Sequence, residues 1–502
     1  MRKMNAQSVP IYIDHNRTID RISPLLFGSF IEHLGRCVYG GIYDPSSPLA
    51  DEQGLRTDVL AALRELNFSI LRYPGGNFVS GYDWKDGIGP LDQRPRRREL
   101  AWGSIETNQF GTDQFIDLCH KLNAEPMLGL NFGTGTIQSA SELVEYCNAP
   151  AGTEWADGRI ANGHPRPHHV RYWCLGNEMD GPWQIGRLTA DQYGQKAREA
   201  AKLMKWQDPS IKLIACGSSN DHLTTYPQWD RITLEHCWEQ IDYLSLHHYA
   251  GNPENDTESY LAYGLRLEQH LETIAATLHH VKTKLRSSHD VHLAWDEWNV
   301  WYRQTNSHGG WREAPPLLEE VYNLEDALVI AQWMNLFLRR CDILKIACLA
   351  QAVNVLAPIR TAGDRLVKQT IFYPFLLFRR HAVGESLDLQ VQCPRYDTRH
   401  GPAPLIDASA TFDRPTGRGA IFLVNRSRHE TLDTRLIWQS DAPQRIACIY
   451  TLAGDDPKTA NTFEQPNNIL PRMTGTQPIQ NHQAQITLPQ LSLTVVATEG
   501  ME

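Results

Sequence analysis

Eight short hydrophobic runs recur along the first three quarters of the chain, and stretches with helical periodicity lie between most of them. The runs are almost continuously apolar, which is typical of strands that are buried on both faces of a sheet. They cover residues 25–33, 68–76, 125–133, 169–178, 211–219, 241–249, 291–299 and 343–354. The helical patterns cover residues 54–67, 111–123, 189–207, 260–285 and 323–340, with Thr189 and Asn323 as expected N-caps.

This alternation predicts an α/β fold, a (β/α)8 TIM barrel, because the strand–helix unit recurs eight times in sequence. A doubly wound open sheet is the alternative, but no GxGxxG segment follows any of the runs. Beyond about residue 380 the pattern changes to alternating β-rich runs that are joined by Gly, Asp, Asn and Pro turns. We therefore expect a barrel over residues 24–379 and a C-terminal antiparallel β-sandwich over residues 380–502, with residues 1–23 adding a strand to the sandwich.

The composition is that of an ordinary globular protein and argues against a polyanionic partner. The 502 residues are 41% hydrophobic, and 48 Lys and Arg against 58 Asp and Glu give a formal charge of −10. Nucleic-acid binding needs concentrated basic residues, and the single basic run, RPRRR at 94–98, is interpreted as a solvated loop or a subunit contact. We expect no nucleic-acid partner.

The cysteines and the N-terminal segment indicate a reducing compartment. The ten cysteines form no CxxC pair and no zinc-like spacing, and several lie inside apolar runs. The N-terminal segment lacks the apolar stretch of a signal peptide, and no segment reaches the roughly 18 uninterrupted apolar residues of a membrane span. The expected location is the cytoplasm, without a membrane partner.

Two carboxylic acids stand out where the hydrophobic runs end, and chemistry gathers at the carboxyl ends of barrel strands. Glu178 follows Asn177 at the end of the fourth run, and Glu297 occupies the corresponding place in the seventh, nearly across the ring. Two carboxyl groups that face one pocket can cleave a glycosidic bond, one as a proton donor and the other as an ionised nucleophile. A separation of about 5–5.5 Å would give retention of the anomeric configuration.

Other polar side chains at the same strand ends could serve these carboxyl groups or a bound sugar. Arg72 could hold Glu297 ionised, and Tyr249 could donate a hydrogen bond to the same carboxylate. Asn177 could bind a sugar 2-hydroxyl. Further hydroxyls could be recognised by Glu32, Asn77 and Gln351. Aromatic rings near expected loops, where they would suit the C–H faces of a sugar, are those of Trp84, Trp102, Trp183, Trp298 and Trp301.

Each of these assignments has a purely structural alternative. The Arg72–carboxylate pair could be architectural, and Tyr249, Gln351 or any single tryptophan could belong to the core. Asp296 is expected to be a helper or structural acid, because its side chain should point to the opposite side of the strand from Glu297. The histidine pairs at 168–169, 247–248 and 279–280 should also point to opposite faces, so we expect no catalytic metal and no cofactor.

The motifs, taken together, resemble glycoside hydrolase family 51, the α-L-arabinofuranosidases. They follow the order of the family and extend over nearly the whole chain. They are FGSFIEHLGRCVYGGIYDP, LRYPGGNFVSGYDWKDGIGP, LAWGSIETNQFGTDQF, WCLGNEMDGPWQIG, LSLHHY, DEWNVWY and LAQAVNVLAPI. The GNE motif alone is shared by a wider clan of retaining barrel hydrolases, so the combined set carries the specificity.

The resemblance implies a retaining double displacement that removes terminal non-reducing α-L-arabinofuranosyl units from arabino-oligosaccharides or arabinoxylan fragments. It implies that Glu178 is the acid/base and Glu297 the nucleophile, with Arg72 beside the nucleophile. The residues that it places around the sugar are Glu32, Asn77, Asn177, Tyr249, Trp301 and Gln351, with Trp102 near the pocket mouth. Position 77 varies in the family between Cys and Asn. A homo-oligomer, commonly a hexamer, is also implied.

Two other functions stay open on the sequence. A relative that cleaves β-xylosides or β-glucans would use the same catalytic pair, and the loops at 77–110 and 300–322 would decide between an open cleft and a closed pocket. A sugar-binding or scaffolding protein on an inactive barrel is a further alternative. It predicts the loss of at least one carboxylate, and both are present.

Overall fold

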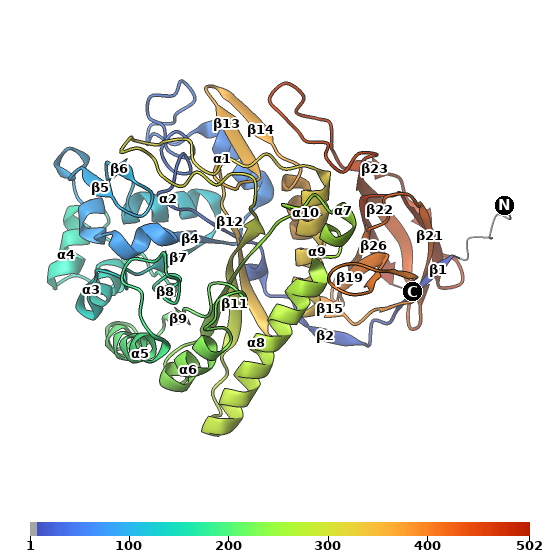
Figure 1. Ribbon diagram of the computed structural model, residues 1–502, viewed down its shortest axis with the longest axis horizontal. Coiled ribbons are helices and arrows are strands. Elements are labelled where there is room, and N and C mark those ends of the chain that lie inside the picture. The colour runs from blue at the N-terminus through green and yellow to red at the C-terminus, as the bar shows by residue number, and fades with distance from the viewer. Residues whose placement is uncertain (1–7, 502) are drawn as a thin grey trace.

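The computed structural model describes residues 8–501 and has a barrel at one end and packed β-sheets at the other (Figure 1). Eight parallel strands close the barrel in the order β10–β11–β12–β3–β4–β7–β8–β9. They are β3 (Gly28–Phe30), β4 (Ile70–Tyr73), β7 (Glu125–Gly129), β8 (Tyr172–Leu175), β9 (Lys212–Ala215), β10 (Tyr243–Ala250), β11 (His292–Val300) and β12 (Leu344–Ala350). Each strand overlaps one of the eight hydrophobic runs, so the predicted barrel is confirmed.

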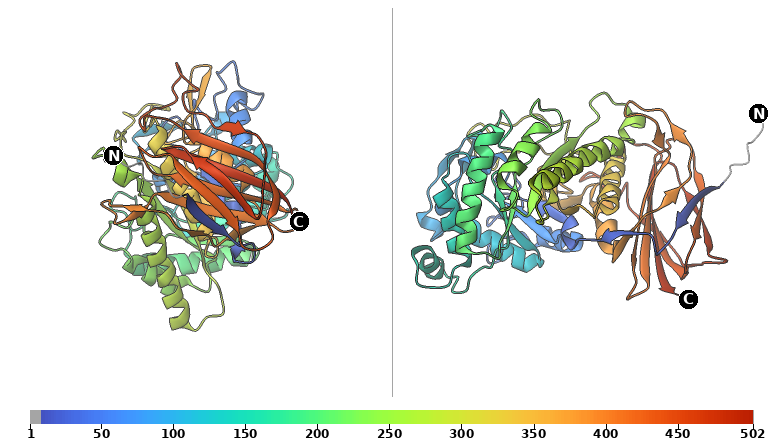
Figure 2. Two further views of the ribbon diagram at one scale, coloured as in Figure 1. Left: turned by 90° about the vertical axis from the view of Figure 1, so that its right-hand side faces the viewer. Right: turned by 90° about the horizontal axis from the view of Figure 1, so that it is seen from below.

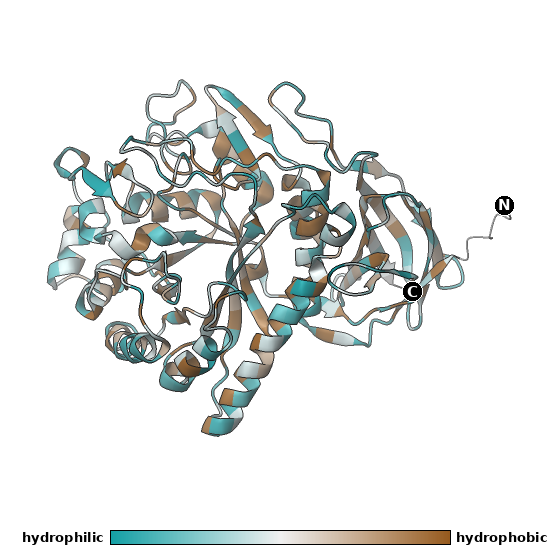
Figure 3. Ribbon diagram, viewed as in Figure 1, coloured by the Kyte–Doolittle hydropathy of each residue, from teal (hydrophilic) through white to brown (hydrophobic). Residues whose placement is uncertain are grey.

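The helices surround the barrel strands. They are α1 (Thr57–Leu66), α2 (Thr112–Leu122), α3 (Ile137–Asn148), α4 (Glu154–Ala161), α5 (Ala190–Gln207), α6 (Gln228–Cys237), α7 (Thr257–Tyr260), α8 (Gly264–Leu285), α9 (Leu324–Arg339) and α10 (Phe372–His381). Thr189 and Asn323 cap α5 and α9 with their side chains, as predicted. In Figure 3, α8 shows alternating hydrophobic and hydrophilic bands, as expected of a helix that is buried on one side.

The interior of the barrel is a packed core and not a channel. Side chains from its strands fill it, and a second, larger core lies between the strands and the helices. The interior residues are Phe30, Ile70, Met127, Tyr172, Cys174, Ile214, Ala294, Ile346, Cys348 and Ala350. Because this interior is apolar, the polar residues of the strands can converge only at the strand ends.

The C-terminal region forms two packed sheets that are mostly antiparallel (Figure 2). The smaller sheet has the order β16 (Gln390–Val391), β1 (Val9–Ile13), β21 (Leu432–Trp438) and β25 (Gln483–Leu488). The larger sheet contains β2 (Thr18–Arg21), β15 (Glu385–Leu387), β19 (Ile406–Asp413), β20 (Arg418–Asn425), β26 (Ser492–Met501), β22 (Pro443–Ala453) and β23 (Arg472–Thr474), and β24 (Gln477–Pro478) pairs with β22. One hydrophobic core lies between the two sheets. The predicted β-sandwich is therefore confirmed.

The barrel and the sandwich meet along α9 and α10. The rings of Phe378 on α10 and Phe422 on β20 stack with centroids 4.1 Å apart. One core lies between the two sheets, while Phe422 on β20 and Val495 on β26 belong to the larger core that includes the barrel helices. The division of the chain at about residue 380 stays a prediction. Strands β1 and β2, from the segment that we assign to the sandwich, each pair with a strand of one of its sheets.

Within residues 8–501, three short hairpins and four 3₁₀ turns complete the fold. The hairpins are β5 (Arg97–Glu99) with β6 (Ser104–Glu106), β13 (Ile359–Ala362) with β14 (Arg365–Lys368), and β17 (Arg395–Tyr396) with β18 (Ala403–Pro404). The 3₁₀ turns are η1 (Pro24–Leu26), η2 (Asn77–Gly81), η3 (Trp84–Gly87) and η4 (Leu91–Gln93). Among residues 8–501, no helix is both long and apolar enough to cross a membrane. All ten cysteines are free thiols.

Candidate active site

The predicted site residues converge on one pocket at the carboxyl ends of the barrel strands. The pocket has a volume of about 540 Å³, within the range of small-molecule sites. Its lining includes Glu32, Asn77, Trp102, Glu178, Tyr249, Glu297, Trp301 and Gln351. Arg72 and Asn177 lie behind this lining, each only 1% exposed; Arg72 hydrogen-bonds to Glu297 of the lining and to Asn177.

The carboxyl groups of Glu178 and Glu297 lie close together in this pocket. One oxygen of each and one ring nitrogen of His247 all lie within 4.8 Å of one another. Glu178 follows β8 at a sharp turn, where its φ of 44° is in the left-handed region. Such a conformation costs a non-glycine residue on the order of 1–3 kcal/mol. The surrounding contacts therefore hold Glu178 in a strained position that aims its carboxyl group at Glu297.

Arg72, on β4, connects several of the site residues. Its guanidinium donates to Oε2 of Glu297 at 2.9 Å and to Oδ1 of Asn177 at 2.6 Å. Burial opposes the charge of Arg72, but Asp296 and Glu297 together hold the pKa of its guanidinium well above the usual range. The bond from Arg72 to Oδ1 also orients the amide of Asn177, whose Nδ2 is left with a longer contact of 3.4 Å to Gln184. The amide of Asn177 is therefore held with its oxygen toward Arg72 and its nitrogen toward Gln184.

The expectation that Asp296 points away from Glu297 is wrong. Oδ2 of Asp296 lies 3.2 Å from Nε of Arg72, so both acids contact the same guanidinium. The pairing of β11 with β12 is irregular between Trp295 and Trp298, and such irregularities change the direction of a side chain. Burial would raise the pKa of Asp296, but Arg72 and His247 lower it to about 2. Asp296 is therefore an ionised partner of Arg72 at neutral pH.

His247 is the site residue that the sequence reasoning missed, because it considered this histidine only as a metal ligand. Nδ1 of His247 lies 3.0 Å from Oε1 of Glu178 and 3.6 Å from Oε2 of Glu297, and Nε2 lies 3.5 Å from Oδ1 of Asp296. Burial disfavours the imidazolium, yet the carboxylates, Glu297 first, raise the pKa of His247 to about 10. A positive charge thus lies among three carboxyl groups at neutral pH. The sequence gives one indication of this position: side chains alternate along β10, so one of His247 and His248 must point into the barrel.

Tyr249 and Trp183 each bind one of the two facing carboxyl groups. The hydroxyl of Tyr249 donates to Oε1 of Glu297 at 2.7 Å. Nε1 of Trp183 donates to Oε2 of Glu178 at 2.5 Å, although the Trp183 ring is 45% exposed. Every oxygen of the two carboxyl groups therefore has a fixed partner, and the ring of Trp183 forms part of the pocket rim.

Glu32 forms the opposite wall of the pocket. It accepts hydrogen bonds from Nε1 of Trp102 at 2.9 Å, from Nε2 of Gln351 at 3.1 Å and from the backbone N–H of Phe78 at 3.1 Å. Burial, with the charge of Glu297, raises the pKa of Glu32 to about 8. A Cβ atom on Gly75 would lie 2.5 Å from the Glu32 side chain, which explains the glycine at this position in PGG.

Two long loops close one side of the pocket. The backbone N–H of Gly309 donates to the carbonyl of Trp102, and that of Trp311 to the carbonyl of Gly103, both at 2.7 Å. Ile105 donates to the carbonyl of Arg312 at 3.0 Å. These bonds join the loop after β4 to the loop after β11, so the site is a pocket on this side and not an open cleft.

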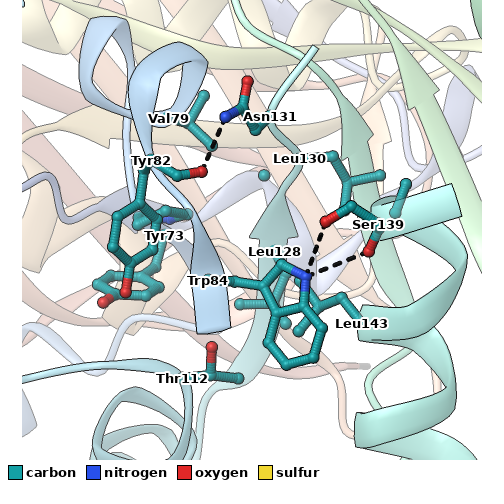
Figure 4. A pocket seen from close by; sticks show the side chains of 13 residues that line it. Tyr73, Val79, Tyr82, Trp84, Thr112, Leu128, Leu130, Asn131, Ser139 and Leu143 are labelled. Atoms are coloured by element: carbon teal, nitrogen blue, oxygen red, sulfur yellow. Dashed lines mark hydrogen bonds between the residues drawn. The ribbon is translucent and has the colours of Figure 1, made fainter. Parts of the chain in front are cut away.

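The five tryptophans divide between this pocket and the core. Trp102, Trp183 and Trp301 line the pocket, whereas Trp298 is fully buried against Trp333. Trp84 lies in a separate small cavity beside β7, where its Nε1 donates to the carbonyl and hydroxyl of Ser139 (Figure 4). That cavity is lined mainly by Tyr73, Tyr82, Leu128, Leu130 and Leu143 and contains none of the carboxyl groups above.

Three clusters of the described residues have the ligand types and spacing to hold a metal ion. They are Glu178–His247–Glu297, Asp113–His164–His168 and Asp221–His248–His270. In the first, His247 is an imidazolium and has no lone pair to offer, so the cluster in the pocket fits proton transfer better than metal binding. Two facing carboxyl groups, one held by an Arg and a Tyr, suit acid/base and nucleophilic chemistry on a small polar ligand.

Comparison with known proteins agrees with this geometry. The α-L-arabinofuranosidase 1 domain matches residues 62–265, and the α-L-arabinofuranosidase C-terminal domain matches residues 296–492. An intracellular exo-α-(1→5)-L-arabinofuranosidase of Halalkalibacterium halodurans is 42% identical over 489 residues, which cover 96% of this chain and 97% of that protein. An exo-α-(1→6)-L-arabinofuranosidase of Bifidobacterium longum is 40% identical, with 97% and 96% covered.

The whole architecture of the chain also matches that of a solved structure. A family 51 α-L-arabinofuranosidase from Bifidobacterium longum superposes with a TM-score of 0.92 at 36% identity. The match covers 98% of this chain and 99% of that one, so it includes the barrel and the sandwich together.

Proposed function

The chain belongs to glycoside hydrolase family 51, the α-L-arabinofuranosidases, and we propose that it removes terminal non-reducing α-L-arabinofuranosyl units by a retaining double displacement. The observation that carries this proposal is the close approach of Glu178 and Glu297, within 4.8 Å between one oxygen of each. Retaining enzymes hold their carboxyl groups about 5–5.5 Å apart, whereas inverting enzymes leave about 6.5–9.5 Å for a water molecule.

In the first step, Glu178 donates its proton to the glycosidic oxygen while Glu297 attacks the anomeric carbon. The bond to the leaving alcohol breaks, and a covalent glycosyl-enzyme forms on Glu297. In the second step, Glu178 takes a proton from water, which attacks the anomeric carbon and releases the sugar. Both steps pass through a transition state with oxocarbenium character, and each inverts the anomeric carbon, so the two inversions together restore the α configuration.

The surrounding residues give these two carboxyl groups different tasks. Arg72 and Tyr249 bind Glu297 and hold its carboxylate in place for attack. Asn177, oriented by Arg72, has amide N–H groups for the sugar 2-hydroxyl, a contact that strengthens as positive charge develops. The remaining ring hydroxyls would be recognised by Glu32, Asn77 and Gln351, with Trp102 and Trp301 against the C–H faces.

The closed side of the pocket supports exo action. Because the loops after β4 and β11 are hydrogen-bonded to each other, a terminal sugar can enter the pocket, but a long chain cannot pass across it. Arabino-oligosaccharides and arabinoxylan fragments are the proposed substrates. The halodurans relative is named intracellular, and on that likeness we assign this chain to the cytoplasm. Assembly into a hexamer is part of the proposal and is checked by sedimentation.

A panel of 4-nitrophenyl glycosides tests the substrate class. The α-L-arabinofuranoside is compared with the β-D-xylopyranoside and the β-D-glucopyranoside, and Glu297→Ala serves as the matched inactive control. We expect release only from the arabinofuranoside. Release from the xyloside or glucoside, without release from the arabinofuranoside, would contradict the proposed specificity. The roles assigned to the two glutamates would still stand. Arabinobiosides with (1→3), (1→5) and (1→6) linkages then define the linkage preference.

A further inference from the structure

A second cluster of ionisable side chains lies outside the pocket chemistry, between β10 and α8. Asp221 belongs to the loop after β9, His248 to β10 and His270 to α8. One ligand atom from each lies within 4.8 Å of the other two. Alternation along β10 sends His247 toward the carboxyl groups and His248 toward the helix layer. His248 also contributes to the pocket lining, so the cluster borders the pocket without containing either of the proposed catalytic glutamates.

The ring nitrogens of this cluster are buried without hydrogen-bond partners. His270 is 2% exposed, and neither of its ring nitrogens has a hydrogen-bond partner among residues 8–501. His248 is also 2% exposed, and although its Nε2 bonds to the hydroxyl of Tyr263 at 2.9 Å, its Nδ1 is likewise unpartnered. Buried polar atoms in folded proteins almost always have a partner, so three such nitrogens in one place indicate a ligand or an ordered water.

The surroundings of the two histidines favour their metal-binding form. Nδ1 of His248 and both ring nitrogens of His270 have no hydrogen-bond partner among the described residues, so each ring has a nitrogen that is open to a ligand. The rings of Tyr226, Trp295 and Trp333 pack around them and exclude competing polar groups. Neutral imidazole with carboxylate is a ligand set that suits zinc and related divalent transition metals.

The spacing of the ligand atoms fits coordination better than direct hydrogen bonding. Nδ1 of His248 lies 3.7 Å from Oδ1 of Asp221, which is too long for a hydrogen bond. Two ligands at about 2.1 Å from a tetrahedral zinc ion are about 3.4 Å apart, so a small movement completes the geometry.

The other side chains that face the cluster include groups that support and groups that oppose the binding of a cation. Arg266 donates to both oxygens of Asp221, which fixes the orientation of the carboxylate, although its charge opposes a nearby cation. Nε2 of His222 lies 3.6 Å from Oδ1 of Asp221 on the solvent side, where the ring is 66% exposed. Nε2 of His222 also lies 2.6 Å from the guanidinium of Arg266, so His222 is already paired and is not counted among the ligands.

We infer that Asp221, His248 and His270 form a binding site for one divalent transition-metal ion of the zinc class. The ion would join the loop after β9, which lines the pocket through Ser219 and Asn220, to β10 and α8. Its role would be to fix this wall of the pocket. The Asp113–His164–His168 cluster differs. There, Asp113 is already hydrogen-bonded to His168 and to the hydroxyl of Tyr146.

Zinc binding to the full-length protein tests this site. The protein is treated with EDTA, dialysed and titrated calorimetrically with Zn²⁺, and Co²⁺ absorption reports on the ligand geometry. We expect one Zn²⁺ per chain, with binding weakened about tenfold or more in His270→Phe and in Asp221→Asn. The matched control is His168→Phe, in the Asp113 cluster, which should bind as the wild type does. Circular dichroism confirms that each variant is folded.

Three results would overturn the inference. The wild type could bind no Zn²⁺, in which case a water molecule satisfies the nitrogens. Both His270→Phe and Asp221→Asn could retain the wild-type affinity. The loss could instead appear in His168→Phe, which would assign the ion to the other cluster. Because Asp221→Asn leaves the buried rings in place, it tests the site even if His270→Phe does not fold. Arabinofuranosidase activity does not enter the readout, so the result is independent of the proposed function.

Discussion

Replacing His247 by Gln removes one positive charge from among three carboxyl groups. The imidazole nitrogens lie 3.0 Å from Glu178, 3.5 Å from Asp296 and 3.6 Å from Glu297. The pKa of His247 is raised from 6.5 to about 10, a difference that corresponds to roughly 5 kcal/mol of interaction favouring the charged form. Arg72 still binds two of the acids in the variant, and we expect a loss of about 5 kcal/mol in the free energy of unfolding at pH 6.

The pH dependence of this loss distinguishes the charge from simple packing. Because the folded pKa lies above the unfolded value, the stabilisation is complete below about pH 6.5 and is lost as the pH rises through about 10. Over that interval the difference between wild type and variant should shrink by about 1.4 kcal/mol per pH unit. Stability is thus more sensitive to the substitution in acid than in alkali.

Guanidinium unfolding, followed by tryptophan fluorescence at pH 6, 8 and 10, measures this difference. His279→Gln, an exposed position on α8, is the matched control and should unfold like the wild type at each pH. A difference between wild type and His247→Gln that stays constant from pH 6 to pH 10 would refute the assigned charge. So would a difference that grows with pH.

Three further substitutions test the proposed roles in catalysis. Glu297→Ala should reduce kcat by about 10⁴-fold or more with an unchanged circular dichroism spectrum, and substantial residual turnover would argue against a nucleophile. Glu178→Ala should lose most activity on arabinobiosides and least on the 4-nitrophenyl glycoside, because the nitrophenolate leaving group needs little protonation. Equal losses on both substrates would contradict the role of Glu178 as the acid. Tyr249→Phe removes the 2.7 Å hydrogen bond to Glu297 and should lower kcat about 10–100-fold at similar KM, whereas an unchanged kcat would make Tyr249 a core residue.

The barrel could be read from the sequence because parallel strands that are covered on both faces stay apolar along their length. All eight runs became barrel strands, and the polar residues at their ends converged for the same reason, since parallel strands end at one face. Glu178 and Glu297 could thus be paired without a structure. The hydrogen bonds between the loops after β4 and β11 could not be predicted, because the path of a loop depends on contacts between residues far apart in the sequence.

The errors arose where local geometry departs from regular alternation. Asp296 was expected to face away from Glu297, but the irregular pairing of β11 brings both to Arg72. His247 was judged as a metal ligand within an adjacent pair, and its position among three carboxyl groups depends on strands that the sequence does not align. Trp298 was grouped with aromatic residues of the loops, yet it lies on β11 and packs into the core.

The anomeric configuration of the first-formed sugar tests the central claim most directly. Hydrolysis of 4-nitrophenyl α-L-arabinofuranoside is followed by proton NMR from the first seconds, before mutarotation mixes the anomers. A double displacement on Glu297 with Glu178 as acid/base predicts that α-L-arabinofuranose appears first. Initial formation of the β anomer would mean direct attack by water, and it would contradict the roles assigned to the two glutamates.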